Sequence, residues 1–186
     1  LEDLLGPPVV PNEKVVYSVP AKPIDAKFDE VYHTGAINSV LAQLGYQGQP
    51  MNEAFGIILS NLENENYTGI AISCGSGQTN VCIGYQADEV ASFSTARGGD
   101  YIDMSTAISL GYDEDDVKNS EVTPALVTLV KEGGVDISNT AQEDRVKNAI
   151  AIYYQNFIRY TVEAIIAHIA SLQDTPRFQE PITIVV

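Results

Sequence analysis

A glycine-rich stretch between two apolar segments carries the strongest chemical signal in the sequence. Residues 69–83 read GIAISCGSGQTNVCI. Glycines let backbone N–H groups approach an anion closely, and hydroxyl or amide side chains can add hydrogen bonds to a phosphate oxygen. One interpretation is therefore a phosphate-binding loop, formed by Gly75, Ser76, Gly77, Gln78, Thr79 and Asn80. The alternative is a tight β-hairpin that needs glycine for its turn type.

Two common phosphate motifs do not fit this stretch. No helix is predicted directly after the glycines, as a dinucleotide-binding fingerprint would require, and no Gly-Lys-Ser/Thr follows, as a P-loop would require. A second glycine pair, Gly98 and Gly99, precedes a predicted helix with Asp100 and Asp103 in its first turns. Those acids are favourable beside the helix dipole, so the pair indicates either plain capping or a second anion clamp.

The elements that position these residues follow from periodicity and turn lengths. Short GSGQ and QADE connections join three strand-like segments, and they are too short for parallel crossovers, so we expect an antiparallel meander. Two further β-branched runs read as buried strands, and all five should share one mixed sheet. The predicted strands are Lys14–Val19, Thr68–Cys74, Thr79–Tyr85, Val90–Thr95 and Ile182–Val186.

Helical periodicity covers much of the remaining chain, which gives an α/β protein with helices on both faces of the sheet. Residues 1–13 are rich in proline and read as a linker or tail, and residues 112–140 read as a small helical insertion. The predicted helices are about 28–44, 53–62, 101–110, 123–131 and 141–172, the last with Tyr153, Tyr154 and Tyr160 as packing and rim residues.

Taken in order, these blocks resemble the second lobe of the actin, heat-shock-chaperone and sugar-kinase ATPase superfamily. Val19-Pro20-Ala21 is similar to the end of a chaperone ATPase strand, and residues 51–57 (MNEAFGI) look like a segment before a family helix. The resemblance covers residues 14–186 and implies a ribonuclease-H-like fold that binds ATP and Mg²⁺. It implies phosphate contacts from Gly75 to Asn80 and from Gly98 and Gly99, a water-positioning carboxylate at Glu53, and a metal-linked carboxylate at Asp100.

The sequence also departs from the family pattern. An aspartate usually opens the second phosphate loop, where Ser73 stands here. The first phosphate loop and the adenosine-contacting loop are not found in residues 1–186, so we expect a fragment of a longer protein that would be inactive alone. The implied function is the phosphate-binding lobe of a chaperone-like ATPase; the alternative is a degenerate, non-hydrolysing binding or polymerising scaffold. Its partners would be a nucleotide and a protein client or a second copy.

Composition excludes several other classes. The chain has 25 acids against 10 bases, a net charge of −15, which disfavours nucleic-acid binding. No apolar run has the length of a membrane span and no signal peptide is visible, so we expect a cytoplasmic protein with Cys74 and Cys82 reduced. His33 and His168 have no ligand cluster at zinc spacing, and no G-x-S-x-G elbow supports a serine hydrolase. Lys118 and Glu121 loosely resemble the family's adenosine-lining helix, or they belong to an exposed helix face.

Overall fold

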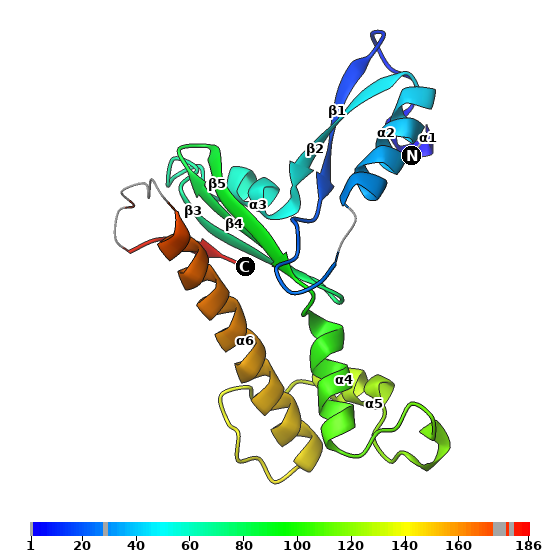
Figure 1. Ribbon diagram of the computed structural model, residues 1–186, viewed down its shortest axis with the longest axis vertical. Coiled ribbons are helices and arrows are strands. Elements are labelled where there is room, and N and C mark those ends of the chain that lie inside the picture. Colours follow the sequence, from blue (N-terminus) through cyan, green and yellow to red (C-terminus); the bar gives the residue numbers. More distant parts are fainter. Residues whose placement is uncertain (1, 28–29, 173–177, 179–180) are drawn as a thin grey trace. The chain divides into compact units, whose positions relative to one another are not determined.

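The computed structural model describes residues 2–27, 30–172, 178 and 181–186. The chain divides into two compact units, and each is described by itself. Unit 1 comprises Leu1–Ser73, Asn80–Ser94 and Pro176–Val186, and unit 2 comprises Cys74–Thr79 and Thr95–Thr175. Figure 1 shows the helices and strands of both units.

Unit 1 contains a two-stranded parallel sheet of β1 (Glu13–Val19) and β2 (Tyr46–Asn52), with α2 (Glu30–Gln43) packed on β2 (Figure 1). Residues alternate between partly covered and exposed along β1, and Val16 is 55% exposed. The prediction of a buried strand here was wrong, because only one face of β1 is covered. Gly45 ends α2 with a φ of +86°, the left-handed conformation that glycine adopts without strain.

The segment predicted to be a linker or tail contains a short helix, α1 (Glu2–Leu5). The Tyr46 hydroxyl donates to the carbonyl oxygens of Leu5 and Gly6, at 3.2 and 3.1 Å. The Asn12 N–H donates to the Gly45 carbonyl at 3.1 Å. These bonds connect residues 5–12 to β2 and to the turn before it.

A second sheet in unit 1 has the strand order β5-β4-β3-β6. The three predicted meander strands are present as β3 (Gly69–Cys74), β4 (Thr79–Tyr85) and β5 (Asp88–Thr95). The fourth strand, β6 (Ile184–Val185), pairs with β3 in parallel. It has only two residues and Ile184 is 55% exposed, so the predicted buried strand over residues 182–186 was wrong in length and burial.

The single five-stranded sheet was also a wrong prediction, because β1 pairs with β2. Beyond Val19 the chain contains Pro20 and Pro23, which lack the N–H that would continue a ladder. The chain then meets β5 through one parallel bridge between Pro23 and Ser94. Helix α3 (Glu53–Asn61) covers the second sheet, and Ala54, Ile58 and Leu62 pack against Ala71 of β3 and Cys82 of β4.

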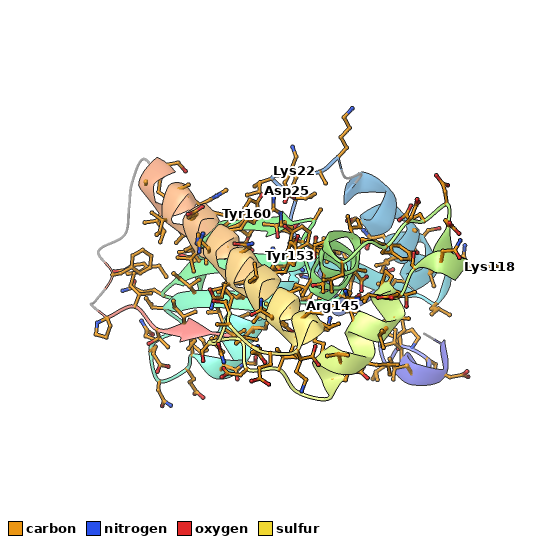
Figure 2. The ribbon with its side chains drawn as sticks, turned by 90° about the horizontal axis from the view of Figure 1, so that it is seen from below. Lys22, Asp25, Lys118, Arg145, Tyr153 and Tyr160 are labelled. Atoms are coloured by element: carbon orange, nitrogen blue, oxygen red, sulfur yellow. The ribbon has the colours of Figure 1, made fainter. Side chains whose placement is uncertain are left out.

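Unit 2 is built from three helices around one apolar core. These are α4 (Gly99–Ser109), α5 (Pro124–Glu132) and α6 (Arg145–Ser171), and a short 3₁₀ helix, η1 (Val117–Asn119), lies between α4 and α5. The core residues are Ile102, Ala107, Val122, Val127, Ile150 and Phe157. Tyr153 and Tyr154 of α6 pack against this core, as predicted; Figure 2 shows Tyr153 and Tyr160 on α6.

Helix α6 starts at Arg145, four residues later than its periodicity predicts. The reason is the cap: the Asp144 carboxylate accepts hydrogen bonds from the N–H groups of Val146 and Lys147, at 2.8 and 3.2 Å. Of the helices formed by described residues, none is both long and apolar enough to cross a membrane.

Candidate functional site

In unit 1, the Glu53 carboxylate is held by two side chains from the meander. Ser73 at the end of β3 donates its hydroxyl to Glu53 Oε1 at 2.5 Å, and Asn80 at the start of β4 donates Nδ2–H to Glu53 Oε2 at 3.3 Å. Asn80 is itself fixed, because its Oδ1 accepts the Ala21 N–H at 3.0 Å. The residue expected to position water therefore has both carboxylate oxygens oriented.

The fold places Glu53 through the junction of β2 and α3. Asn52 is the last residue of β2 and the N-cap of α3, and its Oδ1 accepts from the N–H groups of Ala54 and Phe55 at 2.8 and 3.2 Å. Glu53 is then the first helical residue, at the positive end of the helix dipole. A carboxylate is favoured at this position, so the sequence supports both the helix start and the site.

In unit 2, the turn between β3 and β4 (residues 75–78, the hairpin turn) presents its backbone N–H groups. The Gly75 N–H donates to the Gln78 carbonyl at 2.9 Å and closes the turn. Within the described part of the chain, the N–H groups of Ser76, Gly77 and Gln78 have no acceptor. Three adjacent amides without acceptors form the kind of donor cluster that binds anions.

Gly77 has neither of the local reasons that usually require a glycine. Its φ is not positive, and a Cβ added there would meet no atom within 4 Å. The explanation that the turn type demands glycine does not apply to Gly75 either, since its φ is also not positive. What glycine provides at position 77 is open space above the backbone.

The second glycine pair lies directly against the hairpin turn. A Cβ on Gly98 would fall 2.4 Å from the Ser76 carbonyl oxygen, so only glycine permits this approach. The N–H groups of Gly99 and Asp100 donate to the carbonyl oxygens of Gly75 and Ser76, at 3.0 and 2.8 Å. The two glycine motifs predicted to act together are therefore in contact, and the start of α4 supports the turn.

Thr79 also supports this region from within the protein. It is fully buried, and its hydroxyl donates to the Arg97 carbonyl at 2.9 Å. The hydroxyl has one proton, and that proton is already engaged. Thr79 therefore holds the segment between β5 and Gly98 rather than offering a donor to a phosphate oxygen.

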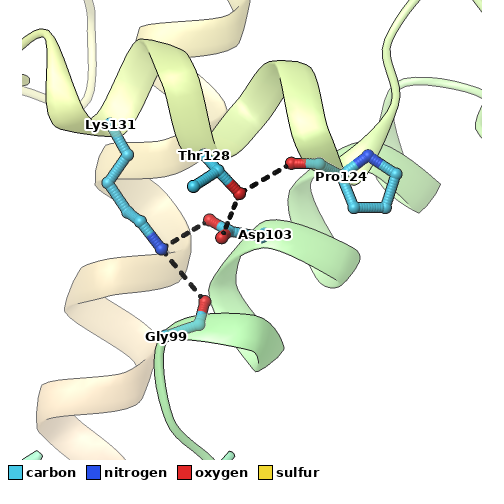
Figure 3. A network of polar contacts seen from close by, with 5 residues as sticks. All are labelled: Gly99, Asp103, Pro124, Thr128 and Lys131. Carbon is cyan, nitrogen blue, oxygen red and sulfur yellow. Dashed lines mark hydrogen bonds and ion pairs between the residues drawn. The ribbon is translucent and has the colours of Figure 1, made fainter. Parts of the chain in front are cut away.

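The two acids at the start of α4 differ in environment. Asp100 is exposed, whereas Asp103 is buried and pairs with Lys131 of α5, with 2.7 Å between Asp103 Oδ1 and Lys131 Nζ. Figure 3 shows this ion pair and the Thr128 hydroxyl, 2.8 Å from Asp103 Oδ2. Asp103 is thus engaged within unit 2, and Asp100 is the freer carboxylate.

Several other residues are explained by local structure. Lys118 lies in η1, and Glu121 lies before α5 and pairs on the surface with Arg145 at 2.6 Å; Figure 2 labels Lys118 and Arg145. Cys74 and Cys82 are free thiols, and burial raises the pKa of both. Among the described residues, no three His, Cys, Asp or Glu side chains gather to hold a metal ion.

Sequence reasoning missed two contacts beside the glycine pair. The Arg97 guanidinium stacks over the Tyr160 ring of α6 at 3.6 Å and lies 4.9 Å from the Tyr101 ring centroid. Lys131 donates to the Gly99 carbonyl at 3.2 Å. Tyr160 and Lys131 are far in sequence from Arg97 and Gly99, so no local pattern could have indicated these two contacts.

Comparison with known proteins agrees with this architecture. A protein-family profile described as Volactin matches residues 1–186. No curated protein matches the chain significantly.

Solved structures share the fold at low sequence identity. MreB5 of Spiroplasma citri bound to AMPPNP superposes with a TM-score of 0.62 at 15% identity, over 93% of this chain and 56% of that one. The ADP-bound form gives 0.56 at 16% identity, over 83% and 52%. Ethanolamine utilization protein EutJ from Carboxydothermus hydrogenoformans gives 0.50 at 15% identity, over 92% and 50%. This chain spans about half the length of these three structures, which share the predicted actin-like fold.

Proposed function

The chain belongs to the Volactin family, and from its actin-like fold we propose that it is the phosphate-binding part of an ATP-binding protein. The observation that carries this proposal is the hairpin turn, where the N–H groups of Ser76, Gly77 and Gln78 have no acceptor among the described residues. Open space above Gly77 leaves room for a phosphate oxygen. Such N–H donors suit the charged oxygens of a nucleotide's phosphates. The ADP and AMPPNP in the two MreB5 structures are consistent with a nucleotide ligand.

Glu53 is the proposed water-positioning residue. A carboxylate offers about four acceptor sites, and Ser73 and Asn80 occupy one on each oxygen. The remaining lone pairs can accept the protons of a water molecule, while the two donors keep the carboxylate from rotating. In phosphoryl transfer, orienting the attacking water in this way is a main contribution of the protein.

Mg²⁺ is proposed to bind chiefly through the nucleotide's phosphates. Magnesium keeps several waters and takes only one or two protein carboxylates in such sites, so a dense protein cage is not required. Asp100 fits that role, because its carboxylate is exposed beside Gly99 and the Asp103 carboxylate is already paired with Lys131. The ion would neutralise phosphate charge in a chain whose own net charge is −15.

A second candidate function is nucleotide binding without turnover, in a scaffold that associates with a client protein or with further copies of itself. Ser73 favours this candidate, because a hydroxyl stands where the resemblance to the actin, heat-shock-chaperone and sugar-kinase ATPases leads us to expect a metal-linked aspartate. ATP binding would then control association rather than be followed by hydrolysis. Measuring ATP hydrolysis by the native full-length protein under saturating ATP separates the two candidates.

Gly77→Val tests the binding proposal itself. The backbone tolerates a side chain at this position, so we expect a melting temperature within about 2 °C of the parent, while ATP affinity measured by calorimetry falls about tenfold or more. Gly35→Val on α2 is the matched control, because a Cβ there also meets nothing within 4 Å. Unchanged ATP affinity in a folded Gly77→Val protein, or no ATP binding by the parent, would overturn the proposal.

A further inference from the structure

A buried ion pair in unit 2 reaches the backbone of the glycine pair. Lys131 Nζ lies 2.7 Å from Asp103 Oδ1 and 3.2 Å from the Gly99 carbonyl oxygen (Figure 3). The side chains of Lys131 and Asp103 are only 18% and 7% exposed. The ammonium group therefore has one ion-pair partner and one hydrogen-bond acceptor in a region from which water is largely excluded.

The peptide unit between Gly99 and Asp100 is held at both ends. Its carbonyl oxygen accepts from Lys131, and its N–H, which belongs to Asp100, donates to the Ser76 carbonyl at 2.8 Å. Because a peptide unit is planar, fixing the carbonyl direction also fixes the direction of the N–H on its opposite side. A chain of contacts thus runs from Lys131 through this peptide to the hairpin turn.

Stability alone does not explain why an ion pair is buried here. Two charges removed from water lose hydration, and apolar side chains of similar volume often serve the fold as well or better. Thr128 does not depend on the pair either, since its hydroxyl is 3.1 Å from the Pro124 carbonyl oxygen as well as 2.8 Å from Asp103. The contact that an apolar pair could not replace is the hydrogen bond to Gly99.

We propose that Lys131, oriented by Asp103, is a positioning residue for the phosphate-binding hairpin turn. It acts through the Gly99–Asp100 peptide, which supports the Ser76 carbonyl and with it the adjacent donors at Gly77 and Gln78. This inference rests on the proposed nucleotide binding, and it assigns α5 a role at the site. The ammonium touches neither of the residues expected to act on water or metal, so its effect is on affinity through geometry.

The test compares Lys131→Arg, Lys131→Met and the double variant Asp103→Leu/Lys131→Met in the native full-length protein, with Lys14→Met as a control that removes one exposed lysine. Three quantities are measured: melting temperature, affinity for ATP, and hydrogen exchange at the Asp100 amide. Lys131→Met leaves the Asp103 carboxylate buried and unpaired, so it should lower the melting temperature. The double variant removes both charges and should stay folded.

In the folded double variant we expect ATP to bind about tenfold more weakly and the Asp100 amide to exchange about tenfold faster, because its hydrogen bond to Ser76 is no longer aligned. Lys131→Arg keeps a donor and should restore most of both. Parent-like affinity and parent-like exchange in the double variant would overturn the inference. A parent protein that binds no ATP would overturn the proposed function instead. Hydrogen exchange at the Asp100 amide of the double variant would then show whether Lys131 orients the Gly99–Asp100 peptide.

Discussion

Ser73 gives the clearest example of how one residue changes the chemistry of its neighbour. Its hydroxyl is 2.5 Å from Glu53 Oε1, and a hydroxyl can donate to a carboxylate where a second carboxylate cannot. The serine therefore does more than remove a negative charge from the loop: it holds Glu53. The absence of a negative charge at position 73 and the fixed orientation of Glu53 both follow from the serine.

Ser73→Asp should for this reason destabilise unit 1 rather than simply restore a metal-linked acid. Two carboxylates at hydrogen-bond distance cannot both stay ionised easily, so the pKa of one should rise. A carboxyl whose folded-state pKa is raised contributes stability below its unfolded pKa and loses it as pH rises through the folded value. We expect the variant to melt at lower temperature at pH 8 than the parent does, with a smaller deficit near pH 4–5.

Ser73→Ala is the control for this comparison. It removes the donor without adding a charge, so it should cost about 1 kcal/mol without the same pH dependence. Parent-like stability of Ser73→Asp at pH 8, together with a gain of ATP hydrolysis, would show that Glu53 does not need the Ser73 hydroxyl. In that case Ser73 would have no role in orienting Glu53, and its only effect would be the lack of a metal-linked carboxylate at this position.

At the scale of elements, β2 and α3 together determine where Glu53 lies. Asn52 ends the parallel pairing of β2 with β1 at Val19 and caps α3 in the same position. Asn52→Ala should therefore lower the free energy of unfolding by about 1–2 kcal/mol, since two N–H groups at a buried helix start lose their acceptor. Denaturant unfolding measures this loss, and Asn52→Asp, which keeps an acceptor, should stay close to the parent. Equal stability of all three proteins would contradict the importance of the cap.

The same junction shows what sequence alone could and could not predict. The meander and α3, α4 and α5 have strong periodicity or unambiguous short turns, so local signals were sufficient. Strand β2 was missed because its sequence, YQGQPMN, contains glycine and proline and no β-branched residue. It is a strand because β1 lies beside it, with Tyr17 opposite Pro50, and that pairing is a tertiary contact.

Some residues of the candidate site could likewise be predicted from the sequence, and others could not. Both glycine motifs and Glu53 could be proposed from the sequence, because a backbone that approaches an anion needs glycine and a helix start favours an acid. The Lys131 contact could not, since Gly99 and Asp103 lie on α4 and Lys131 lies a helix away on α5. The hydrogen bond of Thr79 was missed for a similar reason, because its acceptor, the Arg97 carbonyl, is beyond β5.

At the scale of the whole molecule, the excess of negative charge opposes folding. The chain has 25 acids and 10 bases, so at least 15 acids have no base to pair with; Lys131–Asp103 and Arg145–Glu121 are ion pairs among the described residues. Most of the acidic side chains must therefore be solvated and repel one another. The segment at Asp113–Asp116 concentrates four of them on the exposed side of unit 2.

Stability should consequently rise with salt. Self-repulsion at a net charge of −15 opposes the compact state, and raising NaCl from about 0.01 to 1 M shortens the screening length from about 30 to 3 Å. We expect a gain of about 1 kcal/mol or more, which corresponds to about 2–4 °C per kcal/mol in the melting temperature of a chain of this size. The charge-reduced variant Asp113→Asn/Asp115→Asn/Asp116→Asn separates screening from a general salting-out effect: it should be more stable than the parent at low salt and should gain less on adding NaCl. A parent whose melting temperature does not change with NaCl, or a variant with an equally steep dependence, would show that the acidic surface does not limit the stability of the fold.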